Sequence, residues 1–248
     1  MLFTARKPAI YRSTRSLQSG MNGYYISILH GSLTTVGVAL ASLLVAILLG
    51  LLGAGAKLSG NPIAVALGQL YTTVVRGVPE LLTMLLVFYG GPTVLNAAFE
   101  SMGWNMQVTV NPFIAGVLTI GFIYGAYMTE NFRGAIKAIP FGQREAGLAF
   151  GMGRWQVFRR ITLPQMIRYV VPSFTNSWMA LIKATALVSL IGLHDMTYLA
   201  RQAGSATRQP FVFILMTAVI YLLFTSLSLW VLRKVHARYS LGSEKITL

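Results

Sequence analysis

The feature that most constrains this fold is a set of apolar stretches that are each long enough to cross a lipid bilayer. A membrane-spanning helix needs about 20 mainly apolar residues. Five stretches suit that length, at about residues 24–52, 79–95, 112–132, 169–192 and 211–232. The second is expected to begin earlier, within "NPIAVALGQLYTTVVRGVPELL", and the fourth contains Lys183. Such a chain is expected to fold as an all-α membrane protein with five spans.

The composition agrees with a chain that is surrounded by lipid. Hydrophobic residues make up 55% of the 248 residues and charged residues only 10%, whereas a soluble domain carries about 25% charged residues. The length suits one membrane domain rather than two globular units. The sequence contains no cysteine, which excludes disulfides, thiol catalysis and cysteine metal sites.

The basic residues predict how the spans are oriented, because Lys and Arg concentrate in cytoplasmic loops. The loop between the second and third spans, residues 96–111, contains none. The segment between the third and fourth spans contains seven: Arg133, Lys137, Arg144, Arg154, Arg159, Arg160 and Arg168. We therefore expect this segment and the C-terminal tail, residues 237–248, in the cytoplasm, and the N-terminus on the external side.

The first 20 residues disagree with this orientation. They contain four basic residues and no acidic one (Arg6, Lys7, Arg12 and Arg15), although the topology would place them outside. They do not form a signal peptide, since the apolar run that follows them is far too long. We expect that residues 1–20 are a basic leader, that translation begins at Met21, and that the membrane domain comprises residues 21–236.

Several kinds of chemistry have no counterpart in the sequence. No G-x-x-x-x-G-K-[ST] motif occurs, the three histidines are far apart and the six acidic residues are dispersed, so this chain is not expected to be an enzyme. No bound metal or cofactor is expected. The net charge of +14 comes from basic residues between apolar runs, without a basic stripe carrying interleaved aromatic residues, so nucleic-acid binding is not expected. A stand-alone channel or a secondary carrier remains an alternative, although a carrier usually keeps acids or histidines inside its spans and this chain has few.

A charged, glycine-containing segment at about residues 140–164 interrupts the apolar pattern. It is expected to form two short helical pieces, the first running from Pro140 to Gly151 and the second starting at Gly153. Gly151 can adopt the left-handed conformation that ends a helix. The second piece carries apolar residues at the spacing i, i+3, i+6, which predicts a narrow seam: Trp155, Phe158 and Ile161. By this pattern alone, the segment is an amphipathic helix lying on anionic lipid.

The spacing within the segment resembles the EAA loop of ABC-importer permeases, in which glutamate, two alanines and a glycine precede I-x-L-P. The matching residues are Glu145, Ala146, Gly151, Ile161, Leu163 and Pro164. Gly147 replaces the usual second alanine, which slightly weakens helix propensity. Three stretches resemble the polar amino acid branch of that family: "YTTVVRGVPELLTMLLVFYG", "GFIYGAYMTENFRGAIKAIPFGQREA" and "LIKATALVSLIGLHDM". The resemblance extends from about Met21 to the C-terminus, and "GAGAKLSGN" and "RGVPELL" are similar to permeases for histidine, lysine, arginine and ornithine.

This resemblance implies a five-span type I ABC importer permease with the binding-protein-dependent transport inner-membrane component fold. It implies three partners in the bacterial inner membrane and on its two sides: a second, paralogous permease, a dimer of cytoplasmic ATPase subunits that holds ATP and Mg²⁺, and a periplasmic substrate-binding protein. The N-terminus would be periplasmic and the C-terminus cytoplasmic. The implied substrates are basic amino acids; another polar amino acid or an opine is the alternative within the family.

The resemblance also implies that the segment docks into the ATPase and transmits its movement. Glu145 is expected to contact the ATPase, and Gly151 is expected to allow the sharp turn between the two helical pieces. The other matched residues are expected to share this coupling role. Three apolar side chains either enter the ATPase or pack against the chain's own helices: Phe150, Met152 and Trp155.

Two glutamates near the spans are candidates for the substrate pathway, and each has a structural alternative. Glu130, near the inner end of the third span, either lines the pathway or pairs with Arg133 or Arg76. Glu80 lies four residues after Arg76, so a helical i, i+4 ion pair is the default expectation for it.

The fourth span adds further candidates. Asp195, at the outer end, either meets the binding protein or incoming cations, or is a solvated loop residue. Lys183 lies deeper, where an ammonium group is costly unless it is paired; it either bonds an acid or helix carbonyls, or receives a substrate carboxylate. Four polar side chains either line the pathway or satisfy hydrogen bonds between helices: Tyr124, Tyr127, Thr185 and Ser189.

Overall fold

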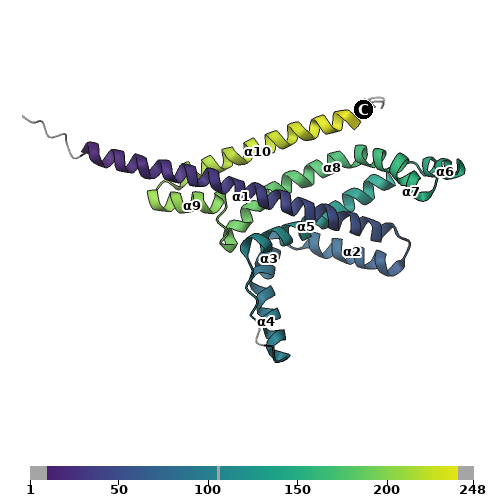
Figure 1. The fold of residues 1–248 in the computed structure, drawn as a ribbon, viewed down its shortest axis with the longest axis horizontal. Helices are drawn as coiled ribbons and strands as arrows, with labels where there is room; N and C mark the ends of the chain where they lie inside the picture. Colours follow the sequence, from purple (N-terminus) through teal and green to yellow (C-terminus); the bar gives the residue numbers. More distant parts are fainter. Residues whose placement is uncertain (1–9, 105–106, 240–248) are drawn as a thin grey trace, which may run out of the picture.

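The computed structural model describes residues 10–104 and 107–239, and within these ranges the chain forms helices and connecting turns without a strand (Figure 1). In chain order the elements are α1 (Ile10–Leu58), α2 (Pro62–Gly77), α3 (Glu80–Leu85), the π-helix η1 (Leu86–Gly90), α4 (Gly91–Ser101), α5 (Pro112–Lys137), α6 (Phe141–Ala149), α7 (Arg154–Val157), the π-helix η2 (Phe158–Thr162), α8 (Leu163–Ala184), the 3₁₀-helix η3 (Thr185–Ile191), α9 (Met196–Thr207) and α10 (Pro210–Tyr239).

Five helical stretches of the described chain are long and apolar enough to cross a membrane. They are Asn22–Leu58, Glu80–Ser101, Pro112–Lys137, Arg154–Ile191 and Pro210–Arg238. Each overlaps one of the five stretches expected from the sequence, so the expectation of an all-α membrane protein with five spans is confirmed. The expected boundaries of the basic leader and of the C-terminal tail stay predictions. Residues 1–9 of the leader and 240–248 of the tail lie outside the described residues. Residues 10–20 of the leader belong to α1.

The centre of the bundle is α5, which packs along α1 and also against α2 and α8. Small residues let α1 and α5 approach closely. A Cβ atom added to Gly53 of α1 would lie 2.3 Å from Oγ1 of Thr129, and one added to Gly121 of α5 would lie 2.6 Å from Cβ of Val45. A larger side chain at either position would therefore push the two helices apart, which is how close packing is usually achieved between membrane helices.

The second span begins later than the sequence suggested. Residues 62–77 form a separate helix, α2, which is capped by Asn61 and packs against α1 and α5. The backbone becomes extended at Val78 (φ −96°, ψ 136°) because a following proline, here Pro79, disfavours the helical conformation. The expectation that the span begins before Pro79, within "NPIAVALGQLYTTVVRGVPELL", is therefore wrong, and α3 starts at Glu80.

The second span, formed by α3, η1 and α4, projects away from the other helices (Figure 1). Met84 is its only buried residue among those described. The rest of this largely apolar helix is left for lipid or another protein to cover.

The two ends of the molecule are built differently. At one end, α9 packs against α1 and α10, around a small core that includes Ile28, Met196 and Phe213. At the opposite end, α6 and α7 lie beyond the bundle of long helices (Figure 1). The charged segment is thus held apart from the apolar body of the chain.

Candidate functional site

The charged segment forms two short helices joined by a tight turn. α6 follows Pro140, and α7 follows Gly153, whose N–H donates to Oε1 of Gln156 at 3.0 Å. Between them, Gly151 has a φ of +80°, in the left-handed region that glycine adopts without steric cost. The two expected helical pieces and the left-handed glycine are confirmed.

α6 rests on η2 at Gly147, which is buried. A Cβ atom at this position would lie 2.7 Å from Cδ1 of Ile161 and 3.1 Å from Cγ2 of Val157, so the missing side chain allows close packing. Trp155 is 70% exposed and stacks on Phe158, with ring centroids 5.6 Å apart. The contact between Trp155 and Phe158 agrees with the expected seam, whereas the buried side chain of α7 is Val157, which is not part of that seam. The helix becomes π-helical at Phe158.

The outer side of the segment carries most of the residues expected to couple to a partner. Glu145, Ala146, Gly151 and Pro164 are exposed, whereas Met152, Ile161 and Leu163 are half-buried. Phe150 is 89% exposed. Phe150 therefore leaves most of its side chain open to a partner, whereas Trp155 contacts Phe158 of η2 and Met152 lies close to Gly147.

Glu130 sits in an ionic network that joins α1, α2 and α5. Its Oε2 accepts from Nη2 of Arg133 at 2.7 Å, and its Oε1 pairs with Nζ of Lys57, which also donates to Oγ1 of Thr72 at 2.7 Å. The Lys57 side chain is only 3% exposed. The expected pairing with Arg133 is confirmed, and pairing with Arg76 is not observed among the described residues. The sequence does not identify Lys57 as a partner, because no local spacing relates it to Glu130.

Glu80 and Arg76 do not form the expected i, i+4 pair, because the helix is broken between them. Instead, Glu80 Oε1 accepts from the hydroxyl of Tyr124 at 3.0 Å. The Arg76 guanidinium lies over the ring of Tyr127, 5.1 Å from its centroid, and the rings of Tyr124 and Tyr127 are 5.6 Å apart. The turn at Val78 thus brings three of the pathway candidates, Glu80, Tyr124 and Tyr127, into one polar cluster with Arg76.

Around the end of α8, two of the candidate side chains form hydrogen bonds within the chain and one does not. Thr185 is buried; its hydroxyl donates to the Ile182 carbonyl at 2.6 Å and lies 3.3 Å from the Tyr221 hydroxyl. The Ser189 hydroxyl donates to the Ala186 carbonyl at 2.8 Å. Lys183 is exposed on the surface of the chain, and its ammonium group makes no hydrogen bond or ion pair with any part of the chain that the structure describes.

Asp195 is fully buried and is not the solvated or externally exposed residue expected from the sequence. It caps α9, its Oδ1 accepting from the N–H of Tyr198 at 2.9 Å. The neighbouring N–H of Met196 donates to Oγ1 of Thr35 on α1 at 3.3 Å, so the cap is pressed against α1. Within the described residues, Asp195 Oδ2 has no hydrogen-bond partner. Burial raises the pKa of Asp195 above its ordinary value, opposed by the hydrogen bond from Tyr198.

A known family and several known proteins match this chain over most of its length. The family described as binding-protein-dependent transport system inner membrane component matches residues 42–241. The histidine/lysine/arginine/ornithine transport system permease protein HisQ of Escherichia coli is 47% identical over 226 residues, which cover 91% of this chain and 99% of the relative. The octopine transport system permease protein OccQ of Rhizobium radiobacter is 38% identical, with 91% and 95% of the two chains covered.

A solved structure has the same arrangement of helices. The crystal structure of an amino acid ABC transporter with histidines contains a chain that superposes with a TM-score of 0.74 at 27% sequence identity, covering 88% of this chain and 97% of that chain. The likeness extends over nearly the whole of both chains, so it concerns the complete bundle and not a single helix pair.

Proposed function

Because the chain belongs to the family of binding-protein-dependent transport system inner membrane components, we propose that it is the permease subunit of an ABC importer that carries basic amino acids into a bacterial cell. The observation that carries this proposal is the 47% identity to HisQ over 91% of the chain. Histidine, lysine, arginine and ornithine are accordingly the proposed substrates. Octopine is a weaker proposal, because its permease is only 38% identical.

The exposed side of α6 and α7 is the proposed docking site for a dimer of cytoplasmic ATPase subunits. Glu145 supplies a charged contact, and Phe150 and Trp155, 89% and 70% exposed, supply apolar ones. Because Gly147 packs tightly on η2, a push on α6 passes to α8 as a rigid-body movement. ATP and Mg²⁺ belong to the ATPase in this proposal, and this chain binds no cofactor.

A second, paralogous permease is proposed to cover part of the projecting span. The span exposes apolar side chains along its length, including Leu86, Tyr89 and Val94. A periplasmic binding protein would deliver substrate at the other side of the membrane from α6. This arrangement places the N-terminus in the periplasm and the C-terminus in the cytoplasm of a protein of the inner membrane.

The proposed substrate pathway runs past Lys183 and the cluster of Glu80 and Tyr127. An ammonium group that is exposed on a membrane span is costly in lipid, so Lys183 is expected to face a polar cavity between the permeases. There it would attract the substrate carboxylate, and Glu80 would attract a basic group. Glu130, Thr185 and Ser189 are engaged within the chain and are proposed to shape the pathway rather than bind substrate.

The orientation can be tested by labelling single cysteines, since the chain has none of its own. A membrane-impermeant thiol reagent should label Trp104→Cys, but not Gln156→Cys, in intact cells with a permeabilised outer membrane. The reverse pattern would overturn the proposed topology.

Coupling can be tested with Glu145→Lys in the importer reconstituted with its ATPase and binding protein. The variant should insert normally but lose ATP hydrolysis stimulated by the loaded binding protein, because a repulsive charge then sits in the docking surface. Glu100→Lys, at another exposed glutamate outside the segment, is the matched control and should hydrolyse ATP normally. Normal stimulation in Glu145→Lys would refute the docking role, and gradient-driven flux by the chain alone would favour the channel or carrier.

A further inference from the structure

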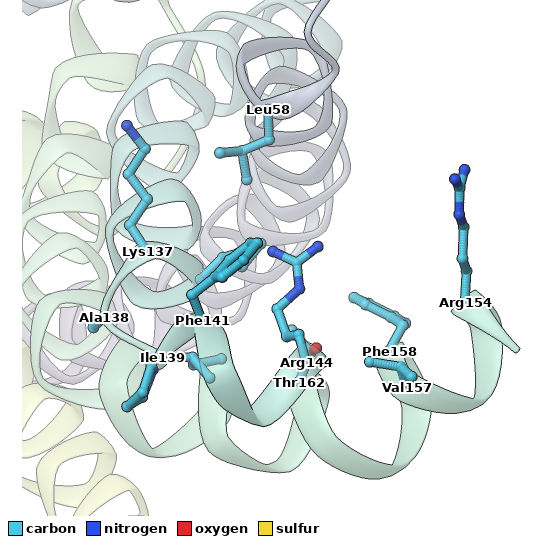
Figure 2. Close-up of a pocket in the computed structure, with 12 residues that line it drawn as sticks. Leu58, Lys137, Ala138, Ile139, Phe141, Arg144, Arg154, Val157, Phe158 and Thr162 are labelled. Carbon is cyan, nitrogen blue, oxygen red and sulfur yellow. The ribbon is translucent and has the colours of Figure 1, made fainter. Parts of the chain in front are cut away.

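The charged segment, residues 140–164, is called the coupling segment from here on, after its proposed role. A pocket of about 480 Å³ lies behind it, where α5 ends and where α6, α7 and η2 lie beside the end of α1 (Figure 2). Three cationic side chains line it: Lys137, Arg144 and Arg154. In Figure 2, Arg144 and Arg154 both point to the side of α6 and η2 on which Leu58 and Lys137 lie. Neither Glu145 nor Phe150 is among the residues that line this pocket.

The residues that the structure describes do not neutralise the charge of this pocket. None of its described lining residues is acidic. Across the described ranges, neither Lys137, Arg144 nor Arg154 forms an ion pair, because both ion pairs found there belong to Glu130. Three unpaired cations around one cavity favour an anionic ligand.

The position of the pocket relative to the bilayer follows from the ends of the helices. Leu58 is the last residue of the first candidate span, Lys137 the last residue of the third, and Arg154 the first residue of the fourth. All three line the pocket. The cavity therefore lies at the ends of three candidate spans, on the side of the membrane where the charged segment lies.

The remainder of the lining is apolar, and this favours a lipid over a soluble anion. Leu58, Val157 and Phe158 line the pocket together with the cations. A phosphate headgroup meets the cations, while its glycerol and upper acyl chain meet the apolar lining. Basic pockets between helices at the cytoplasmic surface bind anionic headgroups in this way.

We propose that this pocket binds the phosphate headgroup of an anionic phospholipid, such as phosphatidylglycerol, from the leaflet next to the coupling segment. The bound lipid neutralises Lys137, Arg144 and Arg154 and fills the space between the segment and the end of α1. The coupling segment thereby has two functional faces, one toward a protein partner and one toward lipid.

The test is a titration of the detergent-purified full chain, with the subunits that copurify, against phosphatidylglycerol and phosphatidylcholine, read by native mass spectrometry. Phosphatidylglycerol should bind the wild type, with affinity that falls as salt rises, and phosphatidylcholine should not bind this site. Arg144→Gln/Arg154→Gln should weaken phosphatidylglycerol binding by about 30-fold, since each basic residue near an anionic headgroup contributes about fivefold. Arg159→Gln/Arg160→Gln removes the same charge from the same segment outside the pocket and should retain the affinity of the wild type.

Other outcomes would overturn the proposal. Equal loss of binding in the two double variants would mean that the basic segment attracts lipid without a site. If glycerol phosphate competes as well as the lipid does, the ligand is a soluble anion. If Arg144→Gln/Arg154→Gln keeps its lipid but no longer copurifies with an ATPase, the pocket holds an acidic side chain of that partner. Matched elution of all variants in size-exclusion chromatography controls for folding.

Discussion

Lys57 places an ammonium group inside the bundle with 3% of its side chain exposed, and its neutralisation depends on Glu130. Removing one partner of a buried ion pair leaves an uncompensated charge, at a cost of about 3 kcal/mol. Glu130→Gln should therefore lower the thermal unfolding midpoint of the purified protein markedly. Arg133→Gln removes the partly exposed partner of the same carboxylate and should cost less than about 1 kcal/mol.

A double variant sharpens this prediction. Lys57→Met/Glu130→Gln removes both buried charges, so it should recover much of the stability that Glu130→Gln loses. If Glu130→Gln is no less stable than Arg133→Gln, the pair with Lys57 contributes little and the network is a surface feature.

Asp195 combines a helix cap with a buried carboxylate, and these two roles can be separated. Because its pKa is raised in the folded state, the native protein holds a proton that the unfolded chain releases once the pH exceeds the ordinary value of 3.8. The free energy of unfolding of the wild type should therefore fall relative to that of Asp195→Asn as the pH rises from about 4. Asparagine is as good an N-cap as aspartate, so the cap is preserved in this variant.

The pH series needs a second variant to identify the cap itself. Asp195→Ala loses the acceptor for the Tyr198 N–H and should be less stable than Asp195→Asn by about 1 kcal/mol at every pH. If the stability of the wild type relative to that of Asp195→Asn stays constant or rises with pH, the burial argument is contradicted.

The turn between α6 and α7 is the element on which coupling depends. Gly151 has a φ of +80°, where a Cβ atom costs about 1 kcal/mol or more, although no other atom lies within 4 Å of it. Gly151→Ala should misplace α6 and lower the ATP hydrolysis stimulated by the loaded binding protein several-fold. Gly153→Ala is the control, because Gly153 has an ordinary φ of −66° and equally open surroundings. Equal activity of the two variants would show that the conformation at Gly151 does not position α6.

Elements were easier to predict than the faces they bury. The pair Pro140 and Gly151 bounded α6 correctly, since proline and glycine act on the backbone of their immediate neighbours. On the next helix, the apolar spacing predicted the contact between Trp155 and Phe158, but it did not predict that Val157 is the side chain buried near Gly147 of α6. Likewise, Pro79 was the local signal for the break before α3, but the apolar run across it concealed the break.

At the scale of the whole molecule, we expect the second permease to bind against the projecting span. Leu86, Val87 and Tyr89 lie at successive positions around one turn of this span. Each can be replaced singly by cysteine, because the chain has no cysteine of its own. A bifunctional thiol reagent should link one of these positions to the second permease carrying its own single cysteine, and the position facing lipid should stay unlinked. If no position forms a link, lipid alone surrounds the span.

The sequence by itself determined the five spans, the charged segment between the third and fourth, and the family. These properties are local: span length and apolar content follow from the thickness of the bilayer, and a motif such as Glu145 to Pro164 is read along the chain. The substrate-pathway candidates were named from residue type and depth, and that information is also local.

Only the tertiary structure decided which of those side chains meet. Lys57 and Glu130 are 73 positions apart, and the hydroxyl of Tyr124 reaches Glu80 because α2 and α3 are bent apart at Val78. Asp195 is buried because α9 folds back onto α1, and the cationic pocket exists because the ends of α1 and α5 and the start of α7 border one cavity. Contacts between distant segments depend on how helices pack and on side-chain volumes at the crossing points, and no local pattern records them.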